Sequence, residues 1–175
     1  IVRFGNVLES NGSVIPLFKS QIEKNGPITL THSEVNRFFM TIEEAAHLVI
    51  ESTMIASGGE IFLLHMGKPI KIIDLATKMI ESYGLRVKSN ENPDGEIEII
   101  EVGLRPGEKI YEELLISDNS VQSKHPKIYI AIEKFIKYEE LMTKLNLLKS
   151  SLDLVYESDK LKKVLKDIVS EYKLK

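Results

Sequence analysis

The feature that most constrains the fold is a helix with a well-defined start, set among short runs of strand-forming residues. Thr41-Ile42-Glu43-Glu44 is a capping box, in which the Thr41 hydroxyl can accept from the Glu44 N–H and the Glu44 carboxylate can accept from the Thr41 N–H. Apolar residues follow at helical spacing and predict one buried face, made by Ile42, Ala45, Ala46, Val49 and Ile50. Ser57-Gly58-Gly59 ends this helix.

Strands and further helices alternate on both sides of it. β-forming residues predict strands over 1–7, 28–31, 60–64, 96–102 and 127–133. Helical spacing predicts helices over 14–24, 74–84, 137–151 and 158–172, with Ser13 and Asp74 as capping residues of the first two. The chain shows no internal repeat, so the mixture predicts an α/β or α+β fold.

Length and composition exclude several classes of protein. The 175 residues suffice for one domain with a buried core, and we expect residues 1–175 to form a single lobe. A net charge of −3 gives no support for a nucleic-acid partner. The absence of cysteine excludes disulfides and thiolate metal sites. No apolar run approaches the roughly 20 residues of a membrane-spanning helix, so we expect no membrane segment in this chain.

The usual catalytic and cofactor motifs are missing from the sequence. It contains neither a G-x-G-x-x-G turn nor a P-loop, so no nucleotide cofactor site is predicted from these residues. The four histidines, His32, His47, His65 and His125, lack the spacing of metal ligands. Spacing alone nominates no Ser/His/Asp arrangement. We therefore predict no catalytic residue and no metal site.

Polar residues follow several predicted strands, which is where open α/β sheets bind ligands. Asn6 ends the first strand, Arg37 precedes the capped helix, and Arg105 and Glu108 follow the strand over 96–102. Two arginines can bind a pyrophosphate, because a guanidinium pairs with phosphate oxygens through two parallel hydrogen bonds. A glutamate nearby can accept from a vicinal diol such as a ribose. These residue types therefore indicate a site for a ligand with both groups.

An interpretation without any ligand fits the same residues. Arg37 can pair with a neighbouring glutamate on the surface, and Arg105 can pair with Glu108 across the turn held by Pro106 and Gly107. Glu108 can also favour the start of a helix predicted over 110–115. Because charged residues are usually exposed and solvated, spacing by itself leaves both interpretations open.

Several blocks of sequence, in order, resemble one known family. They are VRFGNVLESNGSVIPLF, GPITLTHSEVNRFFMTIEEAAHLV, GGEIFLLHMGKPIKIIDLA, EVGLRPGEKIYEELL and HPKIYIA. Together they resemble the C-terminal half of a CapD-like polysaccharide-biosynthesis nucleotide-sugar 4,6-dehydratase, a group within the extended short-chain dehydrogenase/reductase family. The resemblance covers nearly the whole chain.

The resemblance implies a fold and an activity. The chain would supply the last strands of a Rossmann-like parallel sheet and a small α/β lobe that binds a UDP-sugar, typically UDP-N-acetylglucosamine. In the family, an upstream domain holds NAD(P) and carries a catalytic Tyr-x-x-x-Lys pair. The product is a 4-keto-6-deoxy sugar nucleotide used for bacterial surface polysaccharide, including capsule.

The resemblance also assigns roles to residues of this chain. Asn6 resembles an asparagine near the substrate phosphates, Arg37 and Arg105 resemble the pyrophosphate arginines, and Glu108 resembles the ribose-binding acid. The remaining positions resemble the segments around the nucleotide and beside the uracil: Val14, Pro16 and Leu17, then Thr29, Leu30 and Thr31.

Because the catalytic pair and the cofactor glycines would lie upstream, we expect this chain to be inactive alone and to bind no cofactor tightly. We expect the whole protein to be a homo-oligomer in the cytoplasm or on the cytoplasmic face of the membrane. Two alternatives remain open: a piece of a UDP-sugar 4-epimerase, which shares the asparagine and both arginines, and a non-catalytic module for nucleotide-sugar binding or assembly.

Overall fold

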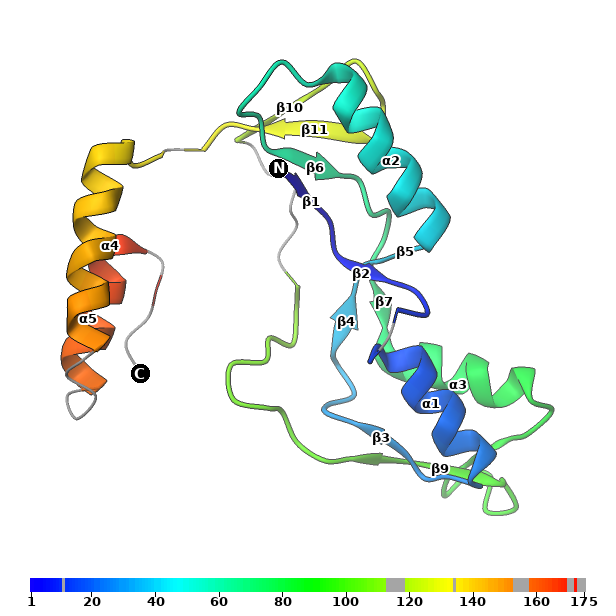
Figure 1. Ribbon diagram of the computed structural model, residues 1–175. Coiled ribbons are helices and arrows are strands. Elements are labelled where there is room, and N and C mark those ends of the chain that lie inside the picture. The colour runs from blue at the N-terminus through cyan, green and yellow to red at the C-terminus, as the bar shows by residue number, and fades with distance from the viewer. Residues whose placement is uncertain (11, 113–118, 134, 153–157, 170–171, 173–175) are drawn as a thin grey trace. The chain divides into compact units, whose positions relative to one another are not determined.

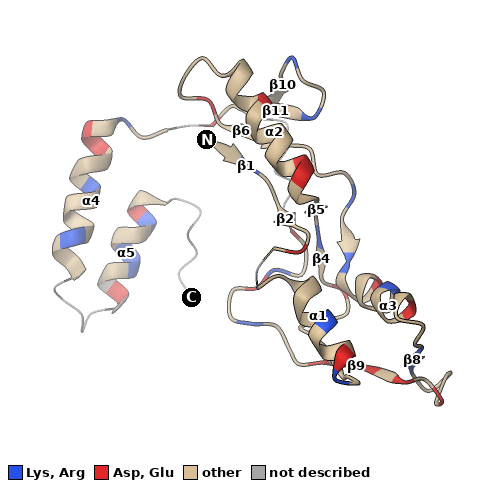
Figure 2. Cartoon of the chain, turned by 45° about the vertical axis from the view of Figure 1, so that its right-hand side comes forward, with Lys and Arg blue, Asp and Glu red and all other residues tan. Residues whose placement is uncertain are grey.

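The computed structural model describes residues 1–10, 12–112, 119–133, 135–152, 158–169 and 172 (Figure 1). The chain divides into two compact units, Ile1–Ile132 and Glu133–Lys175, and each is described by itself. In Figure 2, basic and acidic residues are interspersed along α3 (Ile72–Ser82), α4 (Tyr138–Leu152) and α5 (Ser158–Ile168), in keeping with the small net charge. Within the described part of the chain, no helix combines the length and the apolar composition needed to cross a bilayer.

A four-stranded sheet in the first unit has the order β1-β6-β11-β10. Its strands are β1 (Val2–Arg3), β6 (Phe62–Leu64), β11 (Ile128–Ala131) and β10 (Ser120–Gln122). The β1–β6 pair is parallel, whereas β11 runs antiparallel to both of its neighbours. The strands predicted over 60–64 and 127–133 are thus confirmed as the shorter strands β6 and β11, and the structure shows that they are neighbours in one sheet.

The strand predicted over 1–7, with its end near Gly5 and Asn6, is confirmed in part, because the chain divides it between two sheets. After β1 it bends at Gly5, and β2 (Asn6–Val7) pairs in parallel with β5 (Phe39–Met40). Gly5 allows a close approach at this bend: a Cβ there would lie 3.3 Å from the Phe38 carbonyl oxygen and 3.2 Å from the Met66 methyl carbon.

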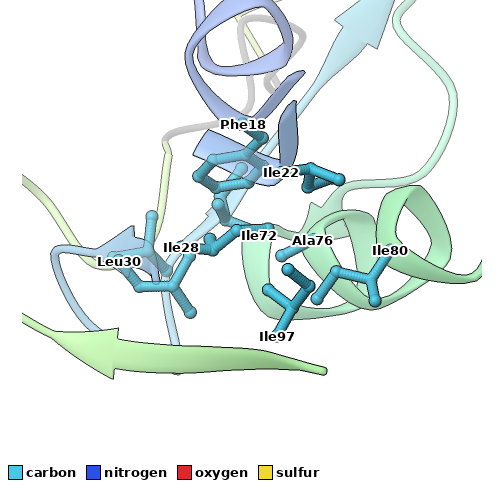
Figure 3. Close-up of a cluster of buried hydrophobic side chains, with 9 residues drawn as sticks. Phe18, Ile22, Ile28, Leu30, Ile72, Ala76, Ile80 and Ile97 are labelled. Carbon is cyan, nitrogen blue, oxygen red and sulfur yellow. The ribbon is translucent and has the colours of Figure 1, made fainter. Parts of the chain in front are cut away.

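A second, parallel sheet has the order β3-β9-β8. It contains β3 (Ile28–Leu30), β9 (Ile97–Glu101) and β8 (Val87–Lys88). The helices α1 (Val14–Glu23) and α3 contact each other and β3. Figure 3 shows their side chains converging with those of the strands. The buried cluster is Phe18, Ile22, Ile28, Leu30, Val35, Ile72, Ala76, Ile80 and Ile97.

A short antiparallel pair, β4 (Asn36–Arg37) with β7 (Ile70–Lys71), leads into α3. This helix begins at Ile72, so Asp74 lies in its first turn and the predicted capping role of Asp74 is wrong. The reason is tertiary, because the Ile72 N–H already donates to the Val35 carbonyl at 2.9 Å. Ser13 occupies the N-cap position of α1, as predicted, but its side chain makes no capping hydrogen bond.

The predicted start of α2 (Ile42–Ile55) is confirmed, since the Glu44 N–H donates to Thr41 Oγ1 at 3.1 Å. The reciprocal half of the capping box is not seen among the described contacts. The Glu44 carboxylate instead accepts from Lys127 Nζ at 2.6 Å, so a residue far away in sequence takes the place of the local partner.

The predicted buried face of α2 is largely wrong. Of the five predicted residues only Ala45 is fully buried, while Ile42 is 56% and Ile50 63% exposed. The helix instead packs through Ala45 and Leu48 on a cluster that includes Phe62, Leu64 and Ile128. Ser52 is buried on the same side, where its Oγ donates to the Leu48 carbonyl at 2.7 Å. Beside Leu48, this face of α2 thus carries the small side chains of Ala45 and Ser52, and the Ser52 hydroxyl is hydrogen-bonded within the helix. The helix can therefore approach the sheet closely.

The second unit consists of α4 and α5, which contact each other. Both predicted helices are confirmed, although α5 ends at Ile168 rather than at Tyr172. Lys144 Nζ donates to the Asp167 carbonyl at 3.1 Å and links the two helices.

The different burial of two isoleucines gives a test of this packing. Ile97→Ala should lower the free energy of unfolding by about 2–5 kcal/mol, because it leaves a cavity in the core of Figure 3. Ile50→Ala should change it by less than about 0.5 kcal/mol, because that side chain is exposed on α2. Urea denaturation measures both values, and equal losses would contradict the burial described for α2.

Candidate functional site

A pocket of about 590 Å³ lies in the first unit, within the range of small-molecule sites. It is lined by residues from β2, the start of α1, β3, the segment 31–39 and the turn 102–108. Nine of the ten residues predicted as substrate-binding line it: Asn6, Val14, Leu17, Thr29, Leu30, Thr31, Arg37, Arg105 and Glu108. Pro16, the tenth, is exposed in the first turn of α1 and does not line the pocket.

Parallel pairing explains why residues far apart in sequence meet here. Thr31 follows β3 and Arg105 follows β9, and these two strands are parallel neighbours. The carboxyl ends of parallel strands lie at the same edge of a sheet, so the two following segments come together. Asn6 joins them because its N–H donates to the Phe38 carbonyl at 3.1 Å, next to the β2–β5 pair.

The turn at 105–108 is closed by two hydrogen bonds. The Glu108 N–H donates to the Arg105 carbonyl at 3.0 Å, and the Arg105 N–H donates to Glu108 Oε2 at 3.0 Å. Pro106 at the second position and Gly107 at the third, with φ +82°, give the pattern of a type II turn, which requires positive φ at its third residue. The helix predicted over 110–115 does not begin at 110–112, and 113–115 lie outside the described residues.

Glu108 is the centre of a polar cluster. Its side chain is 19% exposed, Oε1 accepts from Thr31 Oγ1 at 2.8 Å, and the nearest nitrogen of Arg37 lies 3.6 Å away. Burial acts to raise the pKa of Glu108, but the Arg105 N–H, the Thr31 hydroxyl and the two arginines lower it further, so the net pKa is below the usual 4.5. Glu108 is therefore an anion at neutral pH.

The two arginines of the pocket have different surroundings. The Arg37 side chain is 15% exposed. Its guanidinium donates hydrogen bonds to main-chain carbonyls and lies beside carboxylates. Arg105 is exposed, and its guanidinium makes no ion pair among the residues that the structure describes. The alternative of an ion pair between the Arg105 and Glu108 side chains is not seen among the described residues. Glu108 accepts instead from the Arg105 main-chain N–H, so the guanidinium is available at the pocket.

Eleven of the twenty lining residues were not predicted as part of the site, and they include the polar residues Ser13 and His32. His32 Nδ1 accepts from the Glu34 N–H at 3.1 Å, which fixes the ring at the edge of the pocket beside Thr31. Ser13 Oγ is buried and lacks a hydrogen-bond partner within the described part of the chain. In the sequence, Ser13 precedes the predicted contact Val14, and His32 follows the predicted contact Thr31. This position was the only sequence signal that either residue belongs to the site.

Much of the remaining pocket wall is apolar, and it includes Val14, Leu17, Phe18, Val35 and Phe39. A wall of this kind can hold a flat or apolar part of a ligand, while Arg105 can hold an anionic part. Across the described residues, no group of three His, Cys, Asp or Glu side chains is placed to bind a metal ion.

A family model described as "Polysaccharide biosynthesis protein" matches residues 1–133. The chain belongs to the polysaccharide biosynthesis protein family. It is 52% identical over 141 residues to the capsular polysaccharide biosynthesis protein CapD of Staphylococcus aureus, a match that covers 79% of this chain and 22% of that protein. The resemblance to CapD-like proteins is thereby confirmed, and the chain spans about a fifth of that relative's length.

A solved structure, that of Pen from Bacillus thuringiensis, supports the fold of this family member. It is 44% identical in sequence with a TM-score of 0.63, and the match covers 78% of this chain and 40% of that one. The predicted α/β class is confirmed, as the C-terminal part of an extended short-chain dehydrogenase/reductase fold.

More remote relatives carry two different enzyme names. The chain is 30% identical to the UDP-N-acetylglucosamine 4,6-dehydratase (inverting) of Campylobacter jejuni, covering 79% of this chain and 37% of that enzyme. It is 31% identical to the UDP-glucose 4-epimerase of Rickettsia massiliae, covering 75% of this chain and 36% of that enzyme. Because the two sequence identities are almost equal, they do not distinguish a dehydratase from an epimerase.

The hydrogen bonds of Glu108 predict how its pKa responds to mutation. Thr31→Val removes the donating hydroxyl while keeping the shape, so the pKa of Glu108 should rise toward its ordinary value. Because the folded-state pKa is lowered, the stabilisation from Glu108 is present at neutral pH and is lost as the pH falls through that pKa. In Thr31→Val this loss should be smaller and should be complete at a higher pH, because the folded-state pKa lies closer to that of the unfolded chain.

Carbon-detected NMR of the Glu108 carboxyl during a pH titration measures the effect. Thr31→Ser keeps a hydroxyl and should leave the titration unchanged. An identical titration in Thr31→Val would show that this hydroxyl does not stabilise the carboxylate.

Proposed function

We propose that this chain is the nucleotide-sugar-binding portion of a polysaccharide-biosynthesis enzyme of the UDP-N-acetylglucosamine 4,6-dehydratase type. The observation that carries the proposal is the pocket itself. Among the described residues it combines an Arg105 guanidinium that makes no ion pair, an apolar wall, and main-chain groups of β3 that lie on the side away from β9. A nucleoside diphosphate offers an anion for the guanidinium and a base whose flat face suits the apolar wall and whose polar edge suits β3.

The free edge of β3 suits a uracil. The Leu30 carbonyl accepts from the Val102 N–H at 2.7 Å, on the side of β9. Because successive peptide groups of a strand point in opposite directions, the Thr29 carbonyl and the Thr31 N–H point away from β9. An acceptor followed by a donor can pair with the N–H and the carbonyl of an imide. Gln21 accepts from the Thr29 N–H at 3.2 Å and holds this strand beside α1.

Arg105 and Asn6 are the proposed partners of the diphosphate. A guanidinium binds phosphate oxygens with two parallel, charge-assisted hydrogen bonds. The start of α1 lies on the same pocket through Val14, and the N–H groups of a first helical turn favour an anion. Glu108 is the proposed ribose acceptor; each of its oxygens already accepts one hydrogen bond and retains a further lone pair.

The chemistry itself requires groups that these residues do not supply. NAD(P), which the family implies, needs a glycine-rich turn between a strand and a helix, and the sequence contains no G-x-G-x-x-G. The residues present therefore do not fit this cofactor. We infer that catalysis belongs to the whole protein, working in the cytoplasm or at the inner membrane surface as a homo-oligomer.

A second candidate is a UDP-sugar 4-epimerase, which the relative of that name favours. Two blocks that resemble the dehydratase group, RPGEK and GNVLESNGSVIPLF, favour the first candidate. The product made from UDP-N-acetylglucosamine by the whole protein separates them, since a dehydratase forms a 4-keto-6-deoxy sugar and an epimerase a 4-epimer. A module for binding alone would form neither product.

Substitution of Arg105 tests the binding site. The chain should bind UDP with millimolar to micromolar affinity, or about −4 to −8 kcal/mol. Arg105→Ala should weaken UDP about tenfold while leaving uridine almost unchanged, because the guanidinium contacts only the diphosphate. Arg105→Lys should weaken UDP by less than Arg105→Ala does, because lysine keeps the positive charge but cannot make the two parallel hydrogen bonds of a guanidinium.

Isothermal titration calorimetry measures these affinities, with circular dichroism to show that each variant is folded. Equal losses for UDP and uridine would remove Arg105 from the diphosphate role. A folded wild-type chain that binds neither ligand would contradict the proposed function.

A further inference from the structure

We propose that the helical unit formed by α4 and α5 pairs with the same unit of a second copy of this chain. The inference goes beyond the nucleotide site and does not depend on it. The match to the family model ends at residue 133, where the second unit, Glu133–Lys175, begins. The proposal rests on an apolar stripe of α4 that α5 leaves uncovered.

Apolar residues of α4 repeat with the spacing of a coiled-coil seam. They are separated alternately by three and four residues over two heptads: Tyr138, Leu141, Leu145, Leu148 and Leu152. On α5 the same spacing joins Leu161, Leu165 and Ile168. A seam of this kind packs against another helix, because its side chains insert between those of a facing helix with the same repeat.

Only one side of the α4 seam is covered by α5. The two helices contact each other and lie side by side (Figure 1). Lys144 Nζ reaches the Asp167 carbonyl at 3.1 Å, so the flank of α4 that carries Lys144 faces α5. Leu141 and Leu148, three residues before and four residues after Lys144, lie on this flank and are half-buried.

The other side of the seam is an apolar stripe, made by Tyr138, Leu145 and Leu152, which we call the outer stripe. Its side chains are 71%, 39% and 53% exposed, in that order. They follow one another at intervals of seven residues, so they lie in one row along the helix. None of the 15 residues of α4, all of which the structure describes, is buried. Half of the seam therefore lacks the facing helix that its pattern requires.

A helical pair of this size has few ways to complete a core. Folded units below about 40 residues usually depend on disulfides, a metal ion or association, and the second unit is close to that size. The sequence has no cysteine, and the described residues contain no group of three His, Cys, Asp or Glu side chains placed to bind a metal ion. Association is the way that remains to cover the outer stripe.

The charges beside the outer stripe favour a second copy in antiparallel orientation. Helical geometry puts Glu139, near the start of α4, and Lys149, near its end, on the flank of the stripe away from α5. With a two-fold axis close to Leu145, Glu139 of one copy lies about 3 Å along the helix axis from Lys149 of the other. A parallel pair would place equal charges together. Two such units form a four-helix bundle.

A membrane surface fits the outer stripe less well. A basic amphipathic helix can lie on anionic lipid, and α5 is rich in lysine. However, the apolar residues Leu161, Leu165 and Ile168 of α5 are already half-buried. The stripe on α4 is bordered by a glutamate as well as a lysine, so it offers both signs of charge, as an antiparallel copy of the same helix requires.

Cross-linking through an introduced cysteine tests the contact directly, because the chain has no cysteine of its own. A residue close to a two-fold axis meets its own copy, so Leu145→Cys should form a disulfide between two chains under mild oxidation. Leu147→Cys is the matched control, since Leu147 is 55% exposed on the opposite face of α4. We expect cross-linking on the order of tenfold faster for Leu145→Cys than for Leu147→Cys. Equal rates would overturn the proposal.

Analytical ultracentrifugation of the cysteine-free chain gives a second measurement. With a Kd of about 10 μM, the wild-type chain should be mostly dimeric at about 100 μM and mostly monomeric at about 1 μM. Leu145→Glu should be monomeric at both concentrations, because two carboxylates would meet in an apolar contact, whereas Leu147→Glu should behave as the wild type. Circular dichroism shows that the helices of each variant are intact. A dimer that persists in Leu145→Glu would contradict the proposed surface.

Exchange of charges tests the orientation. Glu139→Lys and Lys149→Glu should each weaken the dimer about two- to tenfold, because each change sets like charges beside each other at two symmetric places. The double variant should regain most of the wild-type affinity. A double variant as weak as the single ones would overturn the antiparallel arrangement.

A wild-type chain that is monomeric at about 100 μM would overturn the pairing of two copies. Pelleting of that monomer with vesicles of phosphatidylcholine and phosphatidylglycerol, lost in Leu145→Glu, would assign the outer stripe to a membrane surface instead.

Discussion

The parallel pairing of β3 with β9 is the constraint on which the candidate site depends. It brings the segments after two strands, about 70 residues apart in sequence, to one edge of a small sheet. Thr31 and Glu108 meet there, and their hydrogen bond joins the two segments directly. Without this pairing, Arg105 would lie on an isolated surface turn, where it would have no apolar wall beside it.

The two arginines at this edge differ in their surroundings. The Arg105 guanidinium is available to a ligand, whereas the Arg37 guanidinium contacts other groups of the protein. Glu108 is held by the Arg105 N–H and the Thr31 hydroxyl and faces the Arg37 guanidinium, which keeps it ionised in a half-buried place. Arg37 in turn is surrounded by carbonyls and carboxylates. The arrangement leaves the Arg105 guanidinium as a cation without an ion pair at the pocket, among the described residues.

Much of the fold could be predicted from local sequence signals. The start of α2 at Thr41, the end of α3 near Gly84 and the strands around 28–30 and 97–101 follow from capping, glycine and alternation. The predictions that are wrong depend on distant contacts. Ile42 and Ile50 follow the helical period but are exposed, because α2 packs on the sheet through Ala45 and Leu48 instead.

The sequence by itself determined the class of fold, the family and the residue types that surround the pocket, because these follow from local patterns and ordered motifs. Only the tertiary structure decided the partner of each charged group. Arg37 faces Glu108 and Glu112, and Glu44 takes Lys127 rather than completing its own capping box. Ion pairs and buried faces form between segments that are distant in sequence, so local spacing carries no information about which of several available partners lies nearest.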